Sequence, residues 1–191
     1  VEYNLDGINQ VLVNEGIGLT FSAALKAFLR QDPDIVMVGE IRDLETAEMA
    51  IQAALTGHLV LSTLHTNDAP SAVTRLLDLG VPSYLLNATV VGVMAQRLVR
   101  TLCDACKSPG GEISDAHWKS LISPFRARKP ARVYRAVGCV ECRMTGYKGR
   151  VGLYELLLLT DELKAMITDK PDLRAIRDAA IRGGLRPLRL A

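Results

Sequence analysis

The chain has 191 residues, of which 49% are hydrophobic and 23% are charged. This composition is typical of an ordinary globular protein with one sizeable core and small satellite modules. The formal net charge of +2 is too small to predict a nucleic-acid partner. No apolar stretch approaches the ~20 residues that span a bilayer. Since no signal peptide is apparent, we expect the intact protein to stay in the cytosol. Its first residues are Val-Glu-Tyr, without a starting Met, and we expect it to be cut from a longer protein.

The first part of the chain predicts an alternation of helices and strands. Residues 1–14 are predicted to form a strand or an extended segment. Thr20 is a suitable N-cap for a helix over 21–31. The apolar run over 35–38 is typical of a buried parallel strand. A second helix is predicted over 44–56, where Gly57 ends it.

The alternation continues downstream. Residues 59–64 predict another buried strand, and helices are predicted over 70–79 and 84–100. Near the end of the chain, residues 161–168 and the residues after Pro171 predict two short helices. This order of elements predicts an α/β fold with parallel strands and right-handed crossovers.

Polar residues follow both predicted strands, at the edge where parallel sheets bind ligands. Gly39-Glu40 follows the first strand, and His65-Thr66-Asn67-Asp68 follows the second. A carboxylate at a strand end can hold Mg²⁺ or polarise a water near a phosphate, and an imidazole can contact a phosphate. The alternatives are that Glu40 is a solvated turn residue and that His65 caps the next helix or fills a turn.

The four cysteines form two C-x-x-C pairs, Cys103/Cys106 and Cys139/Cys142. Four thiolates suit a tetrahedral zinc ion, and in a reducing compartment such pairs bind metal more often than they form disulfides. The 32 residues between Cys106 and Cys139 exceed the usual spacing of a zinc ribbon, but closing a loop of that length adds little entropic cost. Because four cysteines leave no open coordination position, the pattern predicts a structural site.

A basic stretch lies between the two cysteine pairs. It contains four arginines and one lysine: Arg126, Arg128, Lys129, Arg132 and Arg135. Such a stretch is usually a solvated face, and the alternative is a patch for nucleic acid or lipid headgroups. The motif G-x-x-x-x-G-K-S/T, which cradles phosphates, does not occur in the sequence.

Several segments together resemble one family, the ATPases of type II secretion and type IV pilus assembly. Residues 30–46 resemble its Walker B region and residues 57–68 its histidine box. Gln96-Arg97-Leu98, the two cysteine pairs and residues 146–150 also match. The resemblance runs from residue 1 to about residue 160. It fits secretion and pilus-extension ATPases and leaves open which of the two this chain serves. Pilus-retraction ATPases usually lack the cysteine module.

The resemblance implies a RecA-like core that binds ATP and Mg²⁺ in a homo-hexameric ring. It implies Glu40 as the Walker B acid, His65 as the phosphate-facing histidine and Glu2 as part of an acidic box. By the same resemblance, Gly39, Arg42 and Thr63 border the nucleotide. The cysteines are implied as ligands of Zn²⁺. The implied partners are an inner-membrane platform and cytoplasmic-domain proteins, with the ATPase cytoplasmic and attached peripherally to the membrane through them.

Three regions are expected: the C-terminal part of a RecA-like core over 1–100, a tetracysteine zinc module over 101–155 and a helical region over 156–191. The resemblance places the phosphate-binding loop upstream of residue 1, so the fragment alone is predicted to be inactive. Residues 182–191 fit the family ending only loosely and are assigned no role. The alternative function is a zinc-stabilised docking module that contacts membrane partners or nucleic acid through its basic loop.

Overall fold

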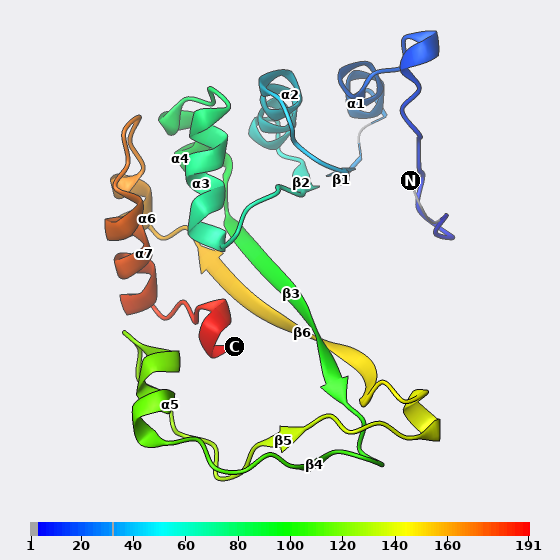
Figure 1. Ribbon diagram of the computed structural model, residues 1–191. Helices are drawn as coiled ribbons and strands as arrows, with labels where there is room; N and C mark the ends of the chain where they lie inside the picture. The colour runs from blue at the N-terminus through cyan, green and yellow to red at the C-terminus, as the bar shows by residue number, and fades with distance from the viewer. Residues whose placement is uncertain (1–3, 32) are drawn as a thin grey trace. The chain divides into compact units, whose positions relative to one another are not determined.

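The computed structural model describes residues 4–31 and 33–191. These residues form two compact units, whose elements are drawn in Figure 1. Unit 1 contains the described residues up to Val93 together with Leu157–Gly183, and unit 2 contains Met94–Leu156 and Gly184–Ala191. Within the described ranges, every helix is too short or too polar to cross a membrane.

Unit 1 consists mainly of helices and two short strands. Its elements are η1 (Glu15–Ile17), α1 (Phe21–Leu29), β1 (Ile35–Val38), α2 (Leu44–Leu55), β2 (Leu59–Ser62), α3 (Ala69–Asp78), α4 (Ser83–Thr89), α6 (Asp161–Met166) and α7 (Leu173–Arg182). Helices α1, α2 and α3 begin where Thr20, Asp43 and Asp68 accept hydrogen bonds from the backbone N–H three residues later. Such N-caps satisfy donors that have no partner within the helix. The predicted pair of short helices near the chain end is confirmed.

Strands β1 and β2 are parallel, with Ile35 opposite Leu59 and Val38 opposite Ser62. Successive side chains of a strand point to opposite faces, and Val36 and Val38 are the buried residues of β1. They pack with Leu25 of α1 in one hydrophobic cluster. The predicted α/β fold and the parallel pairing of these strands are therefore confirmed.

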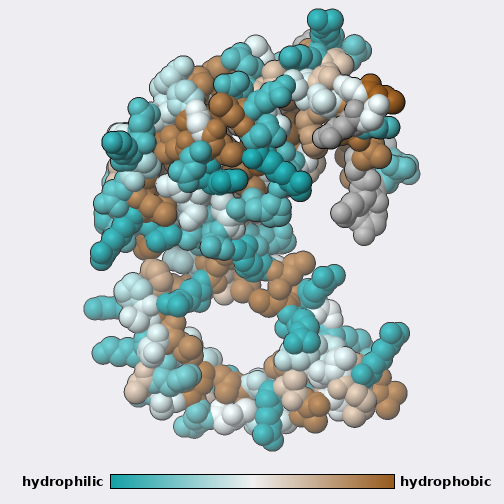
Figure 2. Space-filling view, turned by 45° about the horizontal axis from the view of Figure 1, so that its top comes forward, coloured by the Kyte–Doolittle hydropathy of each residue, from teal (hydrophilic) through white to brown (hydrophobic). Residues whose placement is uncertain are grey.

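The prediction that both strands are buried is wrong. The opposite face of this sheet carries apolar side chains that are about half exposed or more: Ile35, Met37, Leu59 and Leu61. Continuous apolar runs indicate burial on both faces only when helices cover both faces, whereas α1 packs on the Val36 and Val38 face. Exposed hydrophobic residues are not confined to this sheet: brown, hydrophobic residues also appear at other places on the surface in Figure 2.

Unit 2 is built around part of a two-stranded sheet formed by β3 (Gly92–Leu102) and β6 (Tyr147–Leu158). The arrows of these strands point in opposite directions in Figure 1. The N–H of Cys103, just after β3, donates to the carbonyl of Gly146, just before β6. The other elements are β4 (Ser108–Pro109), α5 (Asp115–Ile122), β5 (Tyr134–Arg135), η2 (Val140–Cys142) and η3 (Leu188–Leu190).

The predicted helix over 84–100 is wrong. Helix α4 ends at Thr89, Val90 is extended, and residues from Gly92 onward form β3. Two β-branched valines followed by a glycine lower the helical preference at this point, and pairing with β6 supplies hydrogen-bond partners for an extended backbone. A Cβ atom at Gly92 would lie 3.0 Å from the carbonyl oxygen of Leu157, so a larger residue there would push the two strands slightly apart.

The N-terminal segment, predicted to form a strand or an extended segment, forms no strand in its described residues. Described residues 4–13 contain a turn and no strand, and Asn14 forms an isolated antiparallel bridge with Leu19. Apolar residues such as Ile8 and Leu12 are exposed. Alternating hydrophobicity predicts a strand only where one face is buried, and the burial is lacking here.

Candidate functional site

The loops that follow β1 and β2 are joined by two hydrogen bonds. The hydroxyl of Thr63 donates to the carbonyl of Gly39 at 2.6 Å, and the N–H of Ile41 donates to the carbonyl of Thr63 at 3.1 Å. The strands are parallel, so their carboxyl ends lie at the same edge. These bonds place the polar residues of both loops next to each other.

Glu40 lies at the centre of this edge. One of its oxygens, Oε1, is 2.9 Å from Nε2 of His65, and the other, Oε2, is 2.6 Å from Nη2 of Arg42. The Glu40 side chain is 18% exposed, whereas Arg42 is 76% and His65 87% exposed. The carboxylate is therefore oriented by two groups that themselves face solvent. We call Gly39, Glu40, Arg42, Thr63 and His65 the strand-end site.

The structure thus brings together five of the six residues predicted from the sequence for catalysis and nucleotide binding. The sixth, Glu2, lies outside the described residues. A carboxylate with a fixed direction can bind a divalent cation or accept a hydrogen bond from a water. The exposed imidazole and guanidinium can donate to phosphate oxygens. Glu40 is only 18% exposed and has two partners, which favours an oriented carboxylate over the alternative of a solvated turn residue.

Asp68 lies beside this site and belongs to the polar run predicted at the strand end, although no specific role was predicted for it. Its Oδ1 accepts from the N–H of Ser71 at 2.9 Å, and its Oδ2 accepts from Nη2 of Arg177 at 2.7 Å. Burial raises the pKa of the Asp68 carboxyl, but the bonds from Ser71 and the charge of Arg177 together lower it below its usual value. The cap is visible in the sequence as Asp68 before a helix, whereas Arg177 lies 109 positions away and carries no sequence signal.

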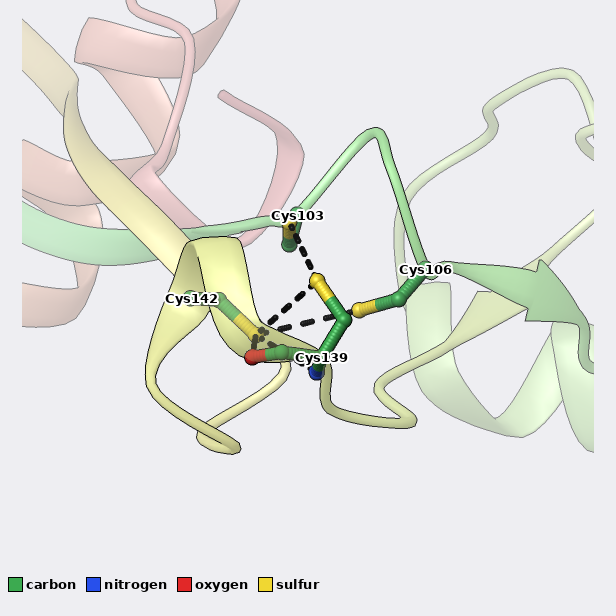
Figure 3. A group of neighbouring side chains, drawn as sticks. All are labelled: Cys103, Cys106, Cys139 and Cys142. Carbon is green, nitrogen blue, oxygen red and sulfur yellow. Dashed lines mark hydrogen bonds between the residues drawn. The ribbon is translucent and has the colours of Figure 1, made fainter.

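The four cysteines of unit 2 converge in one cluster (Figure 3). All four Sγ atoms lie within 4.8 Å of one another. The Cys103–Cys139 pair is 3.9 Å apart, and the Cys106–Cys142 and Cys139–Cys142 pairs are 3.8 Å apart. A tetrahedron with metal–sulfur bonds of about 2.3 Å has edges of roughly 3.8 Å. A disulfide needs sulfur atoms about 2.05 Å apart, so the geometry suits a metal and excludes disulfides.

The pKa values of two of the cysteines also favour a bound cation in this cluster. Burial raises the pKa of the Cys142 thiol, but hydrogen bonds from the N–H groups of Cys139 and Gly146 help to lower it to about 6. The N–H of Gly138 lowers the pKa of Cys106, but burial and the other three sulfur atoms raise it to about 11. Four thiolates this close repel one another, and a divalent cation bound between them removes that repulsion.

The basic stretch belongs to unit 2 and is largely solvated. Lys129 forms an ion pair with Asp115 of α5, and Nε of Arg135 donates to the hydroxyl of Ser108. Arg126, Arg128 and Arg132 are exposed. These contacts fit the prediction of a solvated face, in which individual exposed pairs contribute little to stability.

Structures with the same fold come from ATPases. The crystal structure of the pilus retraction motor PilT with bound ADP matches 86% of this chain with a TM-score of 0.53 and 28% identity, over 36% of its own chain. The ATPase DotB of Legionella pneumophila matches 86% with a TM-score of 0.51 and 25% identity, over 34% of its chain. The parallel strands, the polar residues at their carboxyl ends and this likeness define an α/β fold of the RecA-like kind, which the chain shares with these ATPases.

The sequence matches the family of type II/IV secretion system proteins over residues 1–189, and the chain belongs to that family. The type IV pilus assembly ATPase TfpB of Acinetobacter baylyi is 51% identical over 191 residues, which are 100% of this chain and 32% of the relative. The type II secretion system ATPase E of Vibrio cholerae is 53% identical over 167 residues, 87% of this chain and 33% of the relative. The chain therefore spans about a third of the length of these relatives.

Proposed function

We propose that this chain is part of an ATP-hydrolysing motor subunit that powers type II secretion or type IV pilus assembly. The observation that carries the proposal is the oriented carboxylate of Glu40 at the carboxyl ends of two parallel strands, in a chain about half identical to named secretion and pilus ATPases. We further propose that the intact subunit works in a homo-hexameric ring at the cytoplasmic side of the inner membrane. Its partners there are the platform and cytoplasmic-domain proteins of the machine.

In this proposal Glu40 orients the attacking water and accepts its proton as the terminal phosphate is transferred. His65 and Arg42 donate to phosphate oxygens, where negative charge is concentrated. The oxygens of Glu40 also suit Mg²⁺, which neutralises phosphate charge when it is bound. The hydrogen bond between Thr63 and Gly39 holds the two loops together. The side chains of Glu40, His65 and Arg42 therefore keep their positions relative to one another.

The 191 residues lack the glycine-rich phosphate-binding motif. We therefore propose that hydrolysis belongs to the intact protein and that this fragment alone is inactive. Binding of a nucleoside triphosphate relies on backbone N–H groups and a lysine of that motif. The strand-end site supplies the groups for the chemical step.

For unit 2 we propose a structural zinc site with Cys103, Cys106, Cys139 and Cys142 as ligands. The sulfur separations and the hydrogen bonds that the backbone donates to Cys106 and Cys142 support this assignment. Such N–H···S bonds are the usual outer-shell support of metal-bound thiolates. The ion when bound would hold the end of β3 and the start of β6 together.

Replacing His65 with alanine tests the proposed role of the strand-end site. In the intact protein we expect kcat for Mg²⁺-dependent ATP hydrolysis to fall about 10- to 100-fold, because one donor to the phosphate is lost. The matched control is His117→Ala, since His117 is exposed on α5 in unit 2. Steady-state phosphate release measures both. Equal turnover in the two variants would show that His65 has no part in the reaction.

A further inference from the structure

An ion pair connects the loop that carries His65 with a helix near the end of the chain. Nη2 of Arg177 on α7 lies 2.7 Å from Oδ2 of Asp68. Asp68 is 27% and Arg177 40% exposed, so the pair is partly shielded from water. Fully exposed ion pairs contribute little because solvent screens them, and this pair is screened less.

The loop between β2 and α3 is held at both ends. At its start Thr63 is bonded to the loop after β1. At its end Asp68 uses Oδ1 to cap α3 through the N–H and hydroxyl of Ser71 and Oδ2 to bind Arg177. His65 lies between these two anchor points, and its Nε2 contacts Glu40. The direction of the imidazole therefore depends on where both ends of the loop are fixed.

Helix α7 presents Arg177 from a well-anchored position. Ile176 is 1% exposed, and Ala179 and Ala180 are each 3% exposed. Asp172 caps the helix by accepting hydrogen bonds from the N–H groups of Arg174 and Ala175. The helix packs on α3 and α6. Because the backbone of α7 is held by packing and by its cap, the base of the Arg177 side chain is fixed. Its guanidinium can therefore define the position of the Asp68 carboxylate.

We propose that Arg177 is a positioning residue for ATP hydrolysis, which holds Asp68 and thereby the loop that aims His65 at the phosphate. This inference rests on the proposed function. Arg177 itself touches neither Glu40 nor His65 in the described contacts of the strand-end site. It acts on the orientation of a group used in the chemical step, so its loss should lower kcat more than it changes KM.

The test compares Arg177→Ala with Arg174→Ala in the intact protein. Arg174 is exposed on the same helix, so the control removes the same charge without the bond to Asp68. For Arg177→Ala we expect kcat to fall about tenfold and KM to change less than about threefold. Arg177→Lys should recover part of the loss, because lysine keeps the charge but not the planar fork.

A second variant keeps the test valid if Arg177→Ala is poorly folded. Asn caps helices about as well as Asp, so Asp68→Asn should retain α3 while weakening the bond to Arg177. We expect its kcat to fall to a similar degree, and the double variant to be no slower than the slower single variant, because both changes remove one interaction. Fully additive losses in kcat would overturn the proposal.

The outcomes separate this inference from the proposed function. If the unmodified intact protein hydrolyses ATP and Arg177→Ala matches Arg174→Ala in kcat, the positioning role is wrong and the ATPase assignment stands. If the unmodified protein does not hydrolyse ATP, the proposed function itself fails. A kcat loss specific to Arg177 and Asp68, with thermal midpoints equal to that of the control, supports the positioning role.

Discussion

Replacing Glu40 with glutamine in the intact protein is expected to reduce ATP turnover by about 100- to 1,000-fold. Glutamine has nearly the same shape, so the loop should stay in place and ATP should still bind. The amide cannot accept a proton from the attacking water and carries no negative charge for Mg²⁺, and removing such a group costs about 10²–10⁴ in rate. Steady-state turnover and nucleotide binding, measured on the same preparation, separate the two effects.

The matched control for this variant is Glu48→Gln. Glu48 is exposed on α2, the helix that follows the Glu40 loop, so the same charge is removed nearby without touching the strand-end site. We expect its turnover to stay within about twofold of the unmodified protein, as for most surface substitutions. Normal turnover of Glu40→Gln would show that Glu40 is not the acid used in hydrolysis.

Replacing Cys139 with serine is expected to remove zinc from the protein and unfold the part of unit 2 around the cluster. The Sγ atom of Cys139 lies within 4 Å of the Sγ atoms of Cys103 and Cys142. Its loss would leave the proposed zinc ion with three of its four sulfur ligands. Structural zinc contributes about 10–16 kcal/mol in small zinc domains, which is comparable to the whole stability of a typical domain, about 5–15 kcal/mol. Elemental analysis and limited proteolysis would measure zinc content and local unfolding.

The control for the cysteine variant is Val140→Ser, which introduces the same residue one position away. Val140 is 90% exposed, so this change should retain one zinc per chain and the protease resistance of the unmodified protein. If Cys139→Ser also kept its zinc and its melting curve, the tetracysteine cluster would not be a structural zinc site. A chelator that strips the ion should reproduce the effect of Cys139→Ser on the unmodified protein.

The grouping of residues at both candidate sites could be predicted from the sequence because each has a local pattern. Glu40 and His65 each follow a short apolar run, and parallel strands bring such positions to one edge. The spacing of each C-x-x-C pair puts two thiolates on one turn, and two such turns make four ligands. In both cases the predicted residues lie together in the structure.

Other features depend on contacts between distant segments and could not be predicted. Val90 and Gly92 lie in a stretch whose apolar residues fit a helix as well as a strand, and only the partner strand β6 decides between them. The bond between Asp68 and Arg177 joins residues 109 positions apart. The exposed face of β1, with Ile35 and Met37, shows that an apolar run alone does not determine which faces are covered.

The most direct test of the ATPase assignment measures Mg²⁺-dependent ATP turnover and zinc content in parallel, on the intact protein and on the 191-residue chain. We predict one zinc per chain in both and turnover only in the intact protein, because the phosphate-binding motif is absent from these 191 residues. Zinc in both with no turnover in the intact protein would contradict the motor assignment and favour a zinc-stabilised docking module.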